Sequence, residues 1–338
     1  MKRKWIRRVS WILLTPVLLF VILMILLYIP PVQNLLRREV TAYASKATGM
    51  QIQVERIDLR FPLNLLVRGV EVIQQPDTLL SLESLNVRVQ AWPLVKGKVE
   101  VDEVTLSQVA FNSANLIEGM KIKGVLGRFF LQSHGVDLSN ELAVINQTEL
   151  SDTHVQMLMN DTTTTPKDTT ASAPVNWKVD LHKLKLKNVS FSMQLPADSM
   201  RMAAHIGEAF INDAQADLKN QFYELKQFLL SGSSANYDTG AAKPGEGFDA
   251  SHIAVRDIRI GLDSLLYKSR DMNAVIREFS MNERSGLSIT SLTGRAFSND
   301  SIIRIPGIKL QTPHSEIDLS AQTYWELVNI PPPGRLSA

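Results

Sequence analysis

The stretch VEVDEVTLSQVAF, residues Val99 to Phe111, places apolar residues in pairs two apart, with a slip of three positions between pairs. Strict alternation indicates a half-buried strand, whereas spacings of three and four indicate an amphipathic helix. This rhythm fits neither. One extra residue in a β-bulge cancels each slip and returns the apolar set to one face. The pattern predicts a bulged, bent strand, and the alternative is a strand that switches faces, as at a sandwich corner.

The same rhythm recurs along the chain. The closest copy is VDLHKLKLKNVSF, Val179 to Phe191, in which all six apolar positions coincide at an offset of 80 residues. Partial copies lie at Ile52–Leu59, Leu80–Val87, Ile253–Ile260 and Ile303–Leu310. Such self-similarity is typical of a repetitive architecture. We predict bulges near Asp102-Glu103, Ser107-Gln108, His182-Lys183 and Lys187-Asn188, and a mostly β fold with a long, bulged, strongly twisted antiparallel sheet.

The N-terminus has a separate, strongly apolar pattern. The run from Trp11 to Ile29 holds no charged residue, and its nineteen residues would reach roughly 28 Å as a helix, close to the thickness of a bilayer core. This predicts a transmembrane helix over residues 11–29. The residues that we assign to the membrane anchor are Trp11, Pro16, Phe20 and Tyr28. A cleaved signal peptide is the alternative, but the apolar run is long for a signal core.

Basic residues precede this span. The residues that set the predicted topology are Lys2, Arg3, Lys4, Arg7 and Arg8. This bias predicts that residues 1–10 form a cytoplasmic basic head and that the rest of the chain lies outside the cytoplasm. We therefore expect a single-pass protein of the inner (plasma) membrane with a periplasmic body.

The remaining chain divides by composition. Helical spacing predicts an amphipathic helix over residues 30–49, ended by Gly49, which either lies at the membrane exit or packs on the following sheet. A Thr-rich segment and a Gly/Ser/Ala-rich segment have the composition of mobile loops. The predicted segments are a first β section over 50–159, a mobile loop over 160–176, a second β section over 177–230, a mobile loop over 231–251 and a third β section over 252–338.

Composition and motifs give no support for catalysis. The chain has no cysteine, a net charge of +2 and six isolated histidines, so neither a metal site nor a basic nucleic-acid surface is indicated. The acidic pair Asp102-Glu103 becomes His182-Lys183 in the second copy, which indicates a solvated face. We predict no enzyme activity, no catalytic residue, no metal, no cofactor and no nucleic-acid partner.

Several stretches together resemble TamB-type proteins of the AsmA-like superfamily, of the kind found in Bacteroidetes. The resemblance rests on the basic head and single span, on Thr48–Val72, Asp77–Val89, Trp92–Phe111, Phe279–Gly294 and on Leu310–Leu319. It implies an open β-groove (a β-taco) that is anchored in the inner membrane, crosses the periplasm and serves outer-membrane biogenesis. The chain ends at PPPGRLSA without the long continuation of that family, so we expect a part of a longer protein.

The resemblance implies two functions. One is transport of inner-membrane phospholipid along an apolar trough, and the other is translocation and assembly of outer-membrane or secreted β-proteins. The second implies a BamA-like outer-membrane barrel as partner, reached through a C-terminal part absent from this sequence. Open strand edges that capture extended peptides would serve the second function.

The apolar residues of the two copies are the predicted lipid-lining residues. They are Val99, Val101, Val104, Leu106, Val109 and Phe111 in the first copy, and Val179, Leu181, Leu184, Leu186, Val189 and Phe191 in the second. Bulges that hold these residues on one face would make a continuous apolar trough. The alternative is that the same face forms the core of a closed sandwich.

Overall fold

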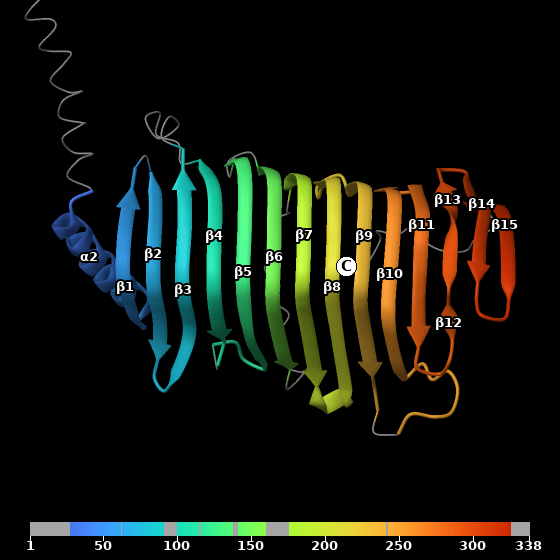
Figure 1. The fold of residues 1–338 in the computed structure, drawn as a ribbon, viewed down its shortest axis with the longest axis horizontal. Coiled ribbons are helices and arrows are strands. Elements are labelled where there is room, and N and C mark those ends of the chain that lie inside the picture. Colours follow the sequence, from blue (N-terminus) through green and yellow to red (C-terminus); the bar gives the residue numbers. More distant parts are fainter. Residues whose placement is uncertain are drawn as a thin grey trace, which may run out of the picture.

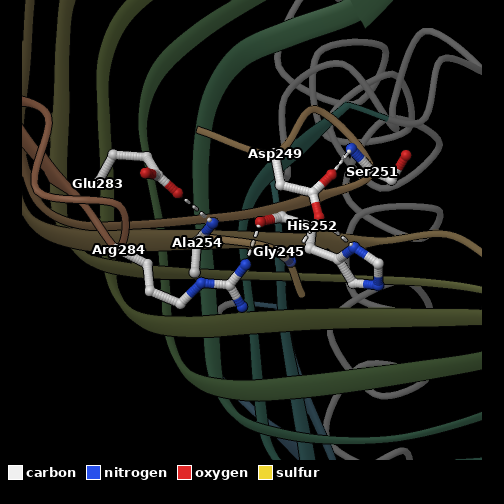
Figure 2. Close-up of polar contacts among 7 residues, drawn as sticks. All are labelled: Gly245, Asp249, Ser251, His252, Ala254, Glu283 and Arg284. Atoms are coloured by element: carbon white, nitrogen blue, oxygen red, sulfur yellow. Dashed lines mark hydrogen bonds and ion pairs between the residues drawn. The ribbon is translucent and has the colours of Figure 1, made fainter. Parts of the chain in front are cut away.

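The chain folds into one long sheet that is a single layer thick. The computed structural model describes residues 28–61, 63–90, 100–114, 116–137, 141–159, 176–240 and 243–325. Its strands form a 15-stranded sheet in chain order, except that β12 lies off the path and pairs with β11. Figure 1 shows the strands side by side from β1, next to helix α2, to β15 at the opposite end. The strands also bend along their length, as the arcs in Figure 2 show, so the sheet is open and curved.

One helix and fifteen strands are described. Helix α2 spans Pro30–Thr48. The strands are β1 Gln51–Arg60, β2 Asn64–Gln74, β3 Asp77–Val89, β4 Val101–Asn112, β5 Met120–Asp137, β6 Leu142–Met159, β7 Lys178–Leu195, β8 Met200–Asp217, β9 Phe222–Asp238, β10 His252–Lys268, β11 Asp271–Glu283, β12 Ser288–Ile289, β13 Ser291–Ser298, β14 Ile302–Gln311 and β15 Glu316–Tyr324. A short 3-10 helix, η1, spans Pro196–Asp198.

Helix α2 forms where the apolar spacing predicts it. Pro30 opens the helix, where its missing N–H costs nothing. Gly49 ends it in the left-handed conformation with φ 69°, and the Gly49 N–H donates to the Ser45 carbonyl at 3.0 Å. Among the described residues, which begin at Tyr28, no helix is long and apolar enough to cross a membrane. Residues 11–27 of the predicted span lie outside the described part of the chain.

The prediction of an antiparallel sheet is wrong at one place. Neighbouring strands are antiparallel, but β6 and β7 pair in parallel, from Leu142 opposite Lys178 to Leu158 opposite Gln194. The connection from Met159 to Lys178 therefore returns the chain to the end of the sheet at which β6 began. A parallel pair needs such a long connection, and the Thr-rich segment supplies it; residues 160–175 of that predicted loop lie outside the described residues.

The breaks in strand pairing lie where the apolar rhythm slips. In β4 the register shifts at Asp102, which is the extra residue opposite the step from Arg88 to Val89. Gln108 interrupts the same ladder and has φ 50°, and Asn188 in β7 has φ 53°. His182 lies opposite Asp213, which has φ 49°, and the two residues are unpaired although the register on both sides of them is the same. Only the interruption at Asp102 is a bulge with an extra residue. At Gln108, His182 and Asn188 one residue is unpaired on each strand and the register is the same on both sides, so the structure has matched interruptions there instead of the predicted bulges.

The interruptions line up across the sheet. From β1 to β9, each strand has one position at the same level where the ladder is broken, and several of these residues have φ between 50° and 60°. We call this line the crease row. It consists of Glu55, Gly69, Glu83, Gln108, Gly127, Asp152, Asn188, Gly207 and Gly232. A residue with positive φ leaves the extended conformation of a strand, so positive φ at the same level in strand after strand bends the sheet along one line.

Residues 231–238 are strand, not loop. Composition assigns 231–251 to a mobile loop, but β9 continues through Asp238. This part of β9 contains Gly232, which has φ 60° and lies in the crease row. A Cβ on the facing Gly207 would come within 2.5 Å of the Gly232 carbonyl oxygen. The small residues here therefore serve close approach of two backbones rather than chain flexibility.

Candidate functional site

The candidate site is one face of the sheet. Residues directly opposite each other in neighbouring strands point to the same face. The predicted lining residues of the first copy from Val101 to Phe111 lie on β4, and those of the second copy lie on β7. Val99 lies outside the described residues. β5 and β6 separate the two copies, so their relation depends on the register of these two strands.

The register places the two copies on shared rungs. Leu106 lies opposite Phe129 of β5, Phe129 opposite Leu150 of β6, and Leu150 opposite Leu186 of β7. The same holds for the other counterparts 80 residues apart. The rungs are Val104–Leu131–Thr148–Leu184, Val109–Leu126–Thr153–Val189 and Phe111–Gly124–Val155–Phe191. The counterparts Val101 and Leu181 are linked through Ser133 of β5. Ser133 Oγ donates to the Val101 carbonyl at 2.6 Å, and Ser133 shares a rung with Ile145 and Leu181.

The apolar rungs continue beyond these four strands. The rung of Leu106 runs toward α2 through Leu85, Val67 and Ile57. In the other direction it continues from Leu186 through Ala209, Leu230, Ile260 and Phe279. Each residue of this rung from β1 to β11 is apolar. We call this side of the sheet the apolar face.

The apolar face is only partly buried. Among the described residues, no large side chain is fully buried, and the buried hydrophobic residues are Leu66, Leu79, Leu82, Ala143, Leu195 and Ala209. Most of the predicted lining residues are half-buried, and Phe191 is 38% exposed. No second layer of described residues packs over the sheet. The described part of the chain is therefore an open sheet and not a closed sandwich.

The opposite face is polar and charged, and we call it the polar face. The rung next to that of Leu106 contains Ser107, Arg128, Lys187 and Glu208. Aromatic residues on this face lie under cations: Arg128 is 5.8 Å from the centroid of Phe130, and Lys185 is 5.6 Å from that of Phe210. The two faces of one sheet thus differ in polarity along most of its length.

A second interrupted level carries an ion-pair cluster. His182 Nδ1 lies 3.1 Å from Asp213 Oδ1, and Lys226 Nζ lies 3.4 Å from Asp213 Oδ2. The hydrogen bond with His182 and the charge of Lys226 lower the pKa of Asp213. These side chains line a cavity of about 150 Å³ with Asp180, Gln215 and Glu224. Because the side chains of His182, Asp213 and Lys226 are substantially exposed, these ion pairs contribute little to stability.

A hydrogen-bond network joins the start of β10 to the end of β11 (Figure 2). Asp249 accepts hydrogen bonds from the Gly245 and Ser251 N–H groups, at 3.2 and 2.9 Å, and lies 2.9 Å from His252 Nδ1. The hydrogen bonds from the two N–H groups, and to a smaller extent the one with His252, lower the pKa of Asp249. Glu283 accepts from the Ala254 N–H, and Arg284 donates to the His252 carbonyl. Hydrogen bonds from the Ser285 side chain and backbone, and from Ala254, lower the pKa of Glu283 to about 2.

This network ties the start of β10 to the end of β11. Asp249 accepts hydrogen bonds from N–H groups of its own loop, whereas Glu283 accepts from Ser285 in its own loop and from Ala254 in β10. In the described part of the chain, no group of three or more His, Asp or Glu residues could hold a metal ion. Comparison of the chain with protein-family models and with curated proteins gives no match.

Sequence reasoning assigned lining residues to two strands of the apolar face and found partial copies in β1, β3 and β10, but it missed β5 and β6 between the two full copies. Phe129 and Leu150 follow no clear copy of the rhythm, because Gly124, Thr148 and Thr153 occupy positions that are apolar in the two full copies. A break in the alternation of apolar and polar residues at Gly127 and Asp152 is the feature of the sequence that could have revealed these two strands. Of the predicted anchor and topology residues, only Tyr28 lies in the described part, where it precedes α2.

Proposed function

We propose that this chain is a segment of an envelope bridge of the TamB type that conducts phospholipid along its apolar face. It is anchored by its N-terminal span in the inner membrane, with the N-terminus in the cytoplasm and the sheet in the periplasm. The observation that carries the proposal is the unbroken apolar rung from Ile57 to Phe279 on an uncovered sheet. In our proposal this face lies on the hollow side of the curved sheet.

Such a face suits movement of acyl chains rather than tight binding at one point. Transfer of each CH₂ group from water to an apolar surface is worth about 0.8 kcal/mol. Because the rung of Leu106 is apolar on every strand from β1 to β11, an acyl chain that moves along it by one strand exchanges one set of contacts for a similar set. The polar face, with Arg128, Lys187 and Glu208 on one rung, remains in water.

A charge placed in the middle of the apolar face tests the proposal. We expect Leu186→Asp to reduce severalfold the phospholipid that copurifies with the full chain in mild detergent, measured by mass spectrometry. The matched control is Lys187→Asp, which changes the next residue of β7 on the polar face and should leave bound lipid unchanged. Leu186→Ser is the milder variant if Leu186→Asp does not fold. Wild-type protein without bound phospholipid, or equal loss in both positions, would refute lipid conduction.

One observation favours a second function, assembly of outer-membrane or secreted β-proteins with a BamA-like partner. β15 is the last strand of the described sheet and pairs only with β14 on one side. Its side chains are exposed, including Ile317 at 50% and Leu319 at 49%. An exposed strand edge can bind an extended peptide by β-augmentation.

Site-specific crosslinking distinguishes the two functions. A photoreactive residue at Ser320 of β15 should capture unfolded outer-membrane protein if the chain is an assembly scaffold. A photoreactive residue at Leu186 should capture lipid if it is a conduit. Crosslinks to protein from Ser320 without crosslinks to lipid from Leu186 would favour the scaffold.

A further inference from the structure

Six of the eleven methionines of the chain gather at one rim of the apolar face. Met157 of β6 lies opposite Met193 of β7, which lies opposite Met202 of β8. Two residues further along, on the next rung of the same face, Met120 of β5 lies opposite Met159. The sixth, Met200, lies opposite Leu195 at the start of β8. We call Met120, Met157, Met159, Met193, Met200 and Met202 the methionine rim; it lies at the end of the sheet where η1 joins β7 to β8 (Figure 1).

Methionine differs from the leucine, valine and isoleucine of the central rungs. Its side chain is unbranched, flexible and polarisable, so it adapts to ligands of irregular shape. The methionines of this rim are partly exposed, and Met202 is 39% exposed. The apolar face therefore changes from stiff branched residues in its middle to flexible residues at this rim.

The polar face carries a basic cavity at the same rim. The cavity has a volume of about 400 Å³ and extends over β5, β6 and β7. Its polar lining consists of Lys121, Lys123, Gln156, Ser192 and Gln194. No carboxylate of a described residue lines it. Its positive charge and hydrogen-bond donors are the chemistry that recognises a phosphate group.

The register brings the cavity and the methionine rim together. Lys121 follows Met120 directly, and Leu158 opposite Lys121 lies between Met157 and Met159. Lys121 and Lys123 are two residues apart in one strand, so both side chains lie on one face at a spacing of about 7 Å. Among the described residues, neither lysine forms an ion pair. Gln156 Nε2 contacts His154 Nε2 at 2.8 Å, which holds one amide at the edge of the cavity.

We propose that this rim binds an anionic phospholipid, with its phosphate at Lys121 and Lys123 and its acyl chains over the methionine rim. The inference rests on the proposed function and names the class of lipid and the place where it is held. A cationic cavity on one face and a flexible apolar patch on the other, one residue apart at the strand ends, match the two parts of such a lipid. A zwitterionic phospholipid carries the same phosphate, but its head-group cation offsets part of the attraction to the two lysines, so it should bind more weakly.

Native mass spectrometry of the full chain in detergent tests this site. The probes are phosphatidylglycerol, phosphatidylcholine with the same acyl chains, and inorganic phosphate. We expect Lys121→Gln/Lys123→Gln to weaken phosphatidylglycerol binding about tenfold and to weaken phosphatidylcholine binding less, because the choline cation already offsets part of the attraction to the lysines. The matched control is Lys185→Gln/Lys187→Gln, which removes two charges at the same spacing from the middle of β7. Met157→Ser/Met193→Ser should weaken both lipids, and Met272→Ser/Met281→Ser is its control.

The outcomes separate this site from the proposed function. Equal binding of phosphatidylglycerol to wild type and to the Lys121/Lys123 variant would overturn the site and leave lipid conduction standing. No phospholipid on the wild-type chain would overturn both. If inorganic phosphate displaces phosphatidylglycerol at similar concentration, the cavity binds a free anion and the lipid assignment is wrong. Loss of binding in the Lys185/Lys187 control to the same extent would show general charge attraction and would also refute the site.

Discussion

Single residues in the left-handed conformation account for the bend of the sheet. Gln108, Asp152 and Asn188 have φ between 50° and 53°, which costs a residue with a side chain about 1–2 kcal/mol. Asn188 Nδ2 recovers part of this cost by donating to Asp152 Oδ1 at 2.7 Å. Facing Asp152, Gly127 has no room for a Cβ, which would lie 2.7 Å from the Asp152 Cβ. The crease row thus combines residues that tolerate positive φ with glycines that admit their neighbours.

Gln108 gives a clean test of the crease row. We expect Gln108→Val to lower the free energy of unfolding by about 1–2 kcal/mol, because a β-branched residue is strained at φ 50°. Gln108→Gly should be neutral or slightly stabilising. Urea unfolding followed by circular dichroism measures both. Ala110→Val, two residues along the same strand, is the control and should have little effect; equal destabilisation at both positions would contradict the conformational explanation.

Glu283 makes the end of the sheet sensitive to acid. Its pKa of about 2 in the folded chain lies below the ordinary 4.5, so its ionised form favours folding. This contribution is fully present above pH 4.5 and is lost as the pH falls from 4.5 to about 2. We expect Glu283→Gln to be less stable than wild type at pH 7, with a difference that shrinks below pH 4.5. Thermal unfolding across this range measures the effect.

Glu278 on the same strand provides the comparison for Glu283. It is exposed and lies opposite Gly261. Glu278→Gln should follow the wild-type dependence on pH. If Glu283→Gln and wild type differ by the same amount at pH 7 and at pH 2, the hydrogen bonds of Glu283 do not act through its charge.

At the scale of elements, the two edge strands of the sheet differ in whether another element covers them. Helix α2 covers the free edge of β1: Arg37 Nη1 donates to the Val54 and Glu55 carbonyls at 3.3 and 2.8 Å, and Gln33 Nε2 donates to the Leu59 carbonyl at 3.0 Å. These side chains occupy acceptors that another strand would otherwise use. β15 has no comparable cover among the described residues. The sheet is therefore closed to added strands at its first strand and open at its last described strand.

Arg37 is the residue that tests this cover. We expect Arg37→Gln to speed hydrogen–deuterium exchange in β1, because α2 would bind the strand edge less firmly. Exchange in β7, far from the helix, should not change. Arg38→Gln is the control, since Arg38 is exposed and makes no contact with β1 that the structure records. Equal exchange in β1 for both variants would contradict the capping role.

The apolar rhythm predicts strands and bulges but not the alignment between strands. At Gln108 and Asn188 the phase slip is visible because apolar residues flank it on both sides. That these two residues lie on one crease row depends on the register of β5 and β6, which turn lengths and pairing set. The same holds for the parallel pairing of β6 and β7. Residues 231–238 have the composition of a loop but form the end of β9, where Gly232 supplies a φ of 60° and its carbonyl oxygen leaves no room for a Cβ on Gly207.

At the scale of the whole molecule, two-sided polarity is the main property of the sheet. The described residues form one sheet and no second layer, so the apolar face stays only partly buried. Repetition of one rhythm along the chain extends the apolar face from strand to strand. A large uncovered apolar surface indicates a site that binds an apolar partner. The proposed occupant is the acyl part of phospholipid.

The most direct measurement is lipid crosslinking from neighbouring residues of opposite faces. Photoreactive residues are placed at Leu106, Leu186 and Leu230, which share one apolar rung, and at Ser107, Lys187 and Ser231, which share the adjacent polar rung. In cells with labelled phospholipid, we predict crosslinks from all three leucine positions and few from their polar neighbours. Crosslinks that are absent, or equally frequent from both rungs, would contradict lipid conduction along the apolar face.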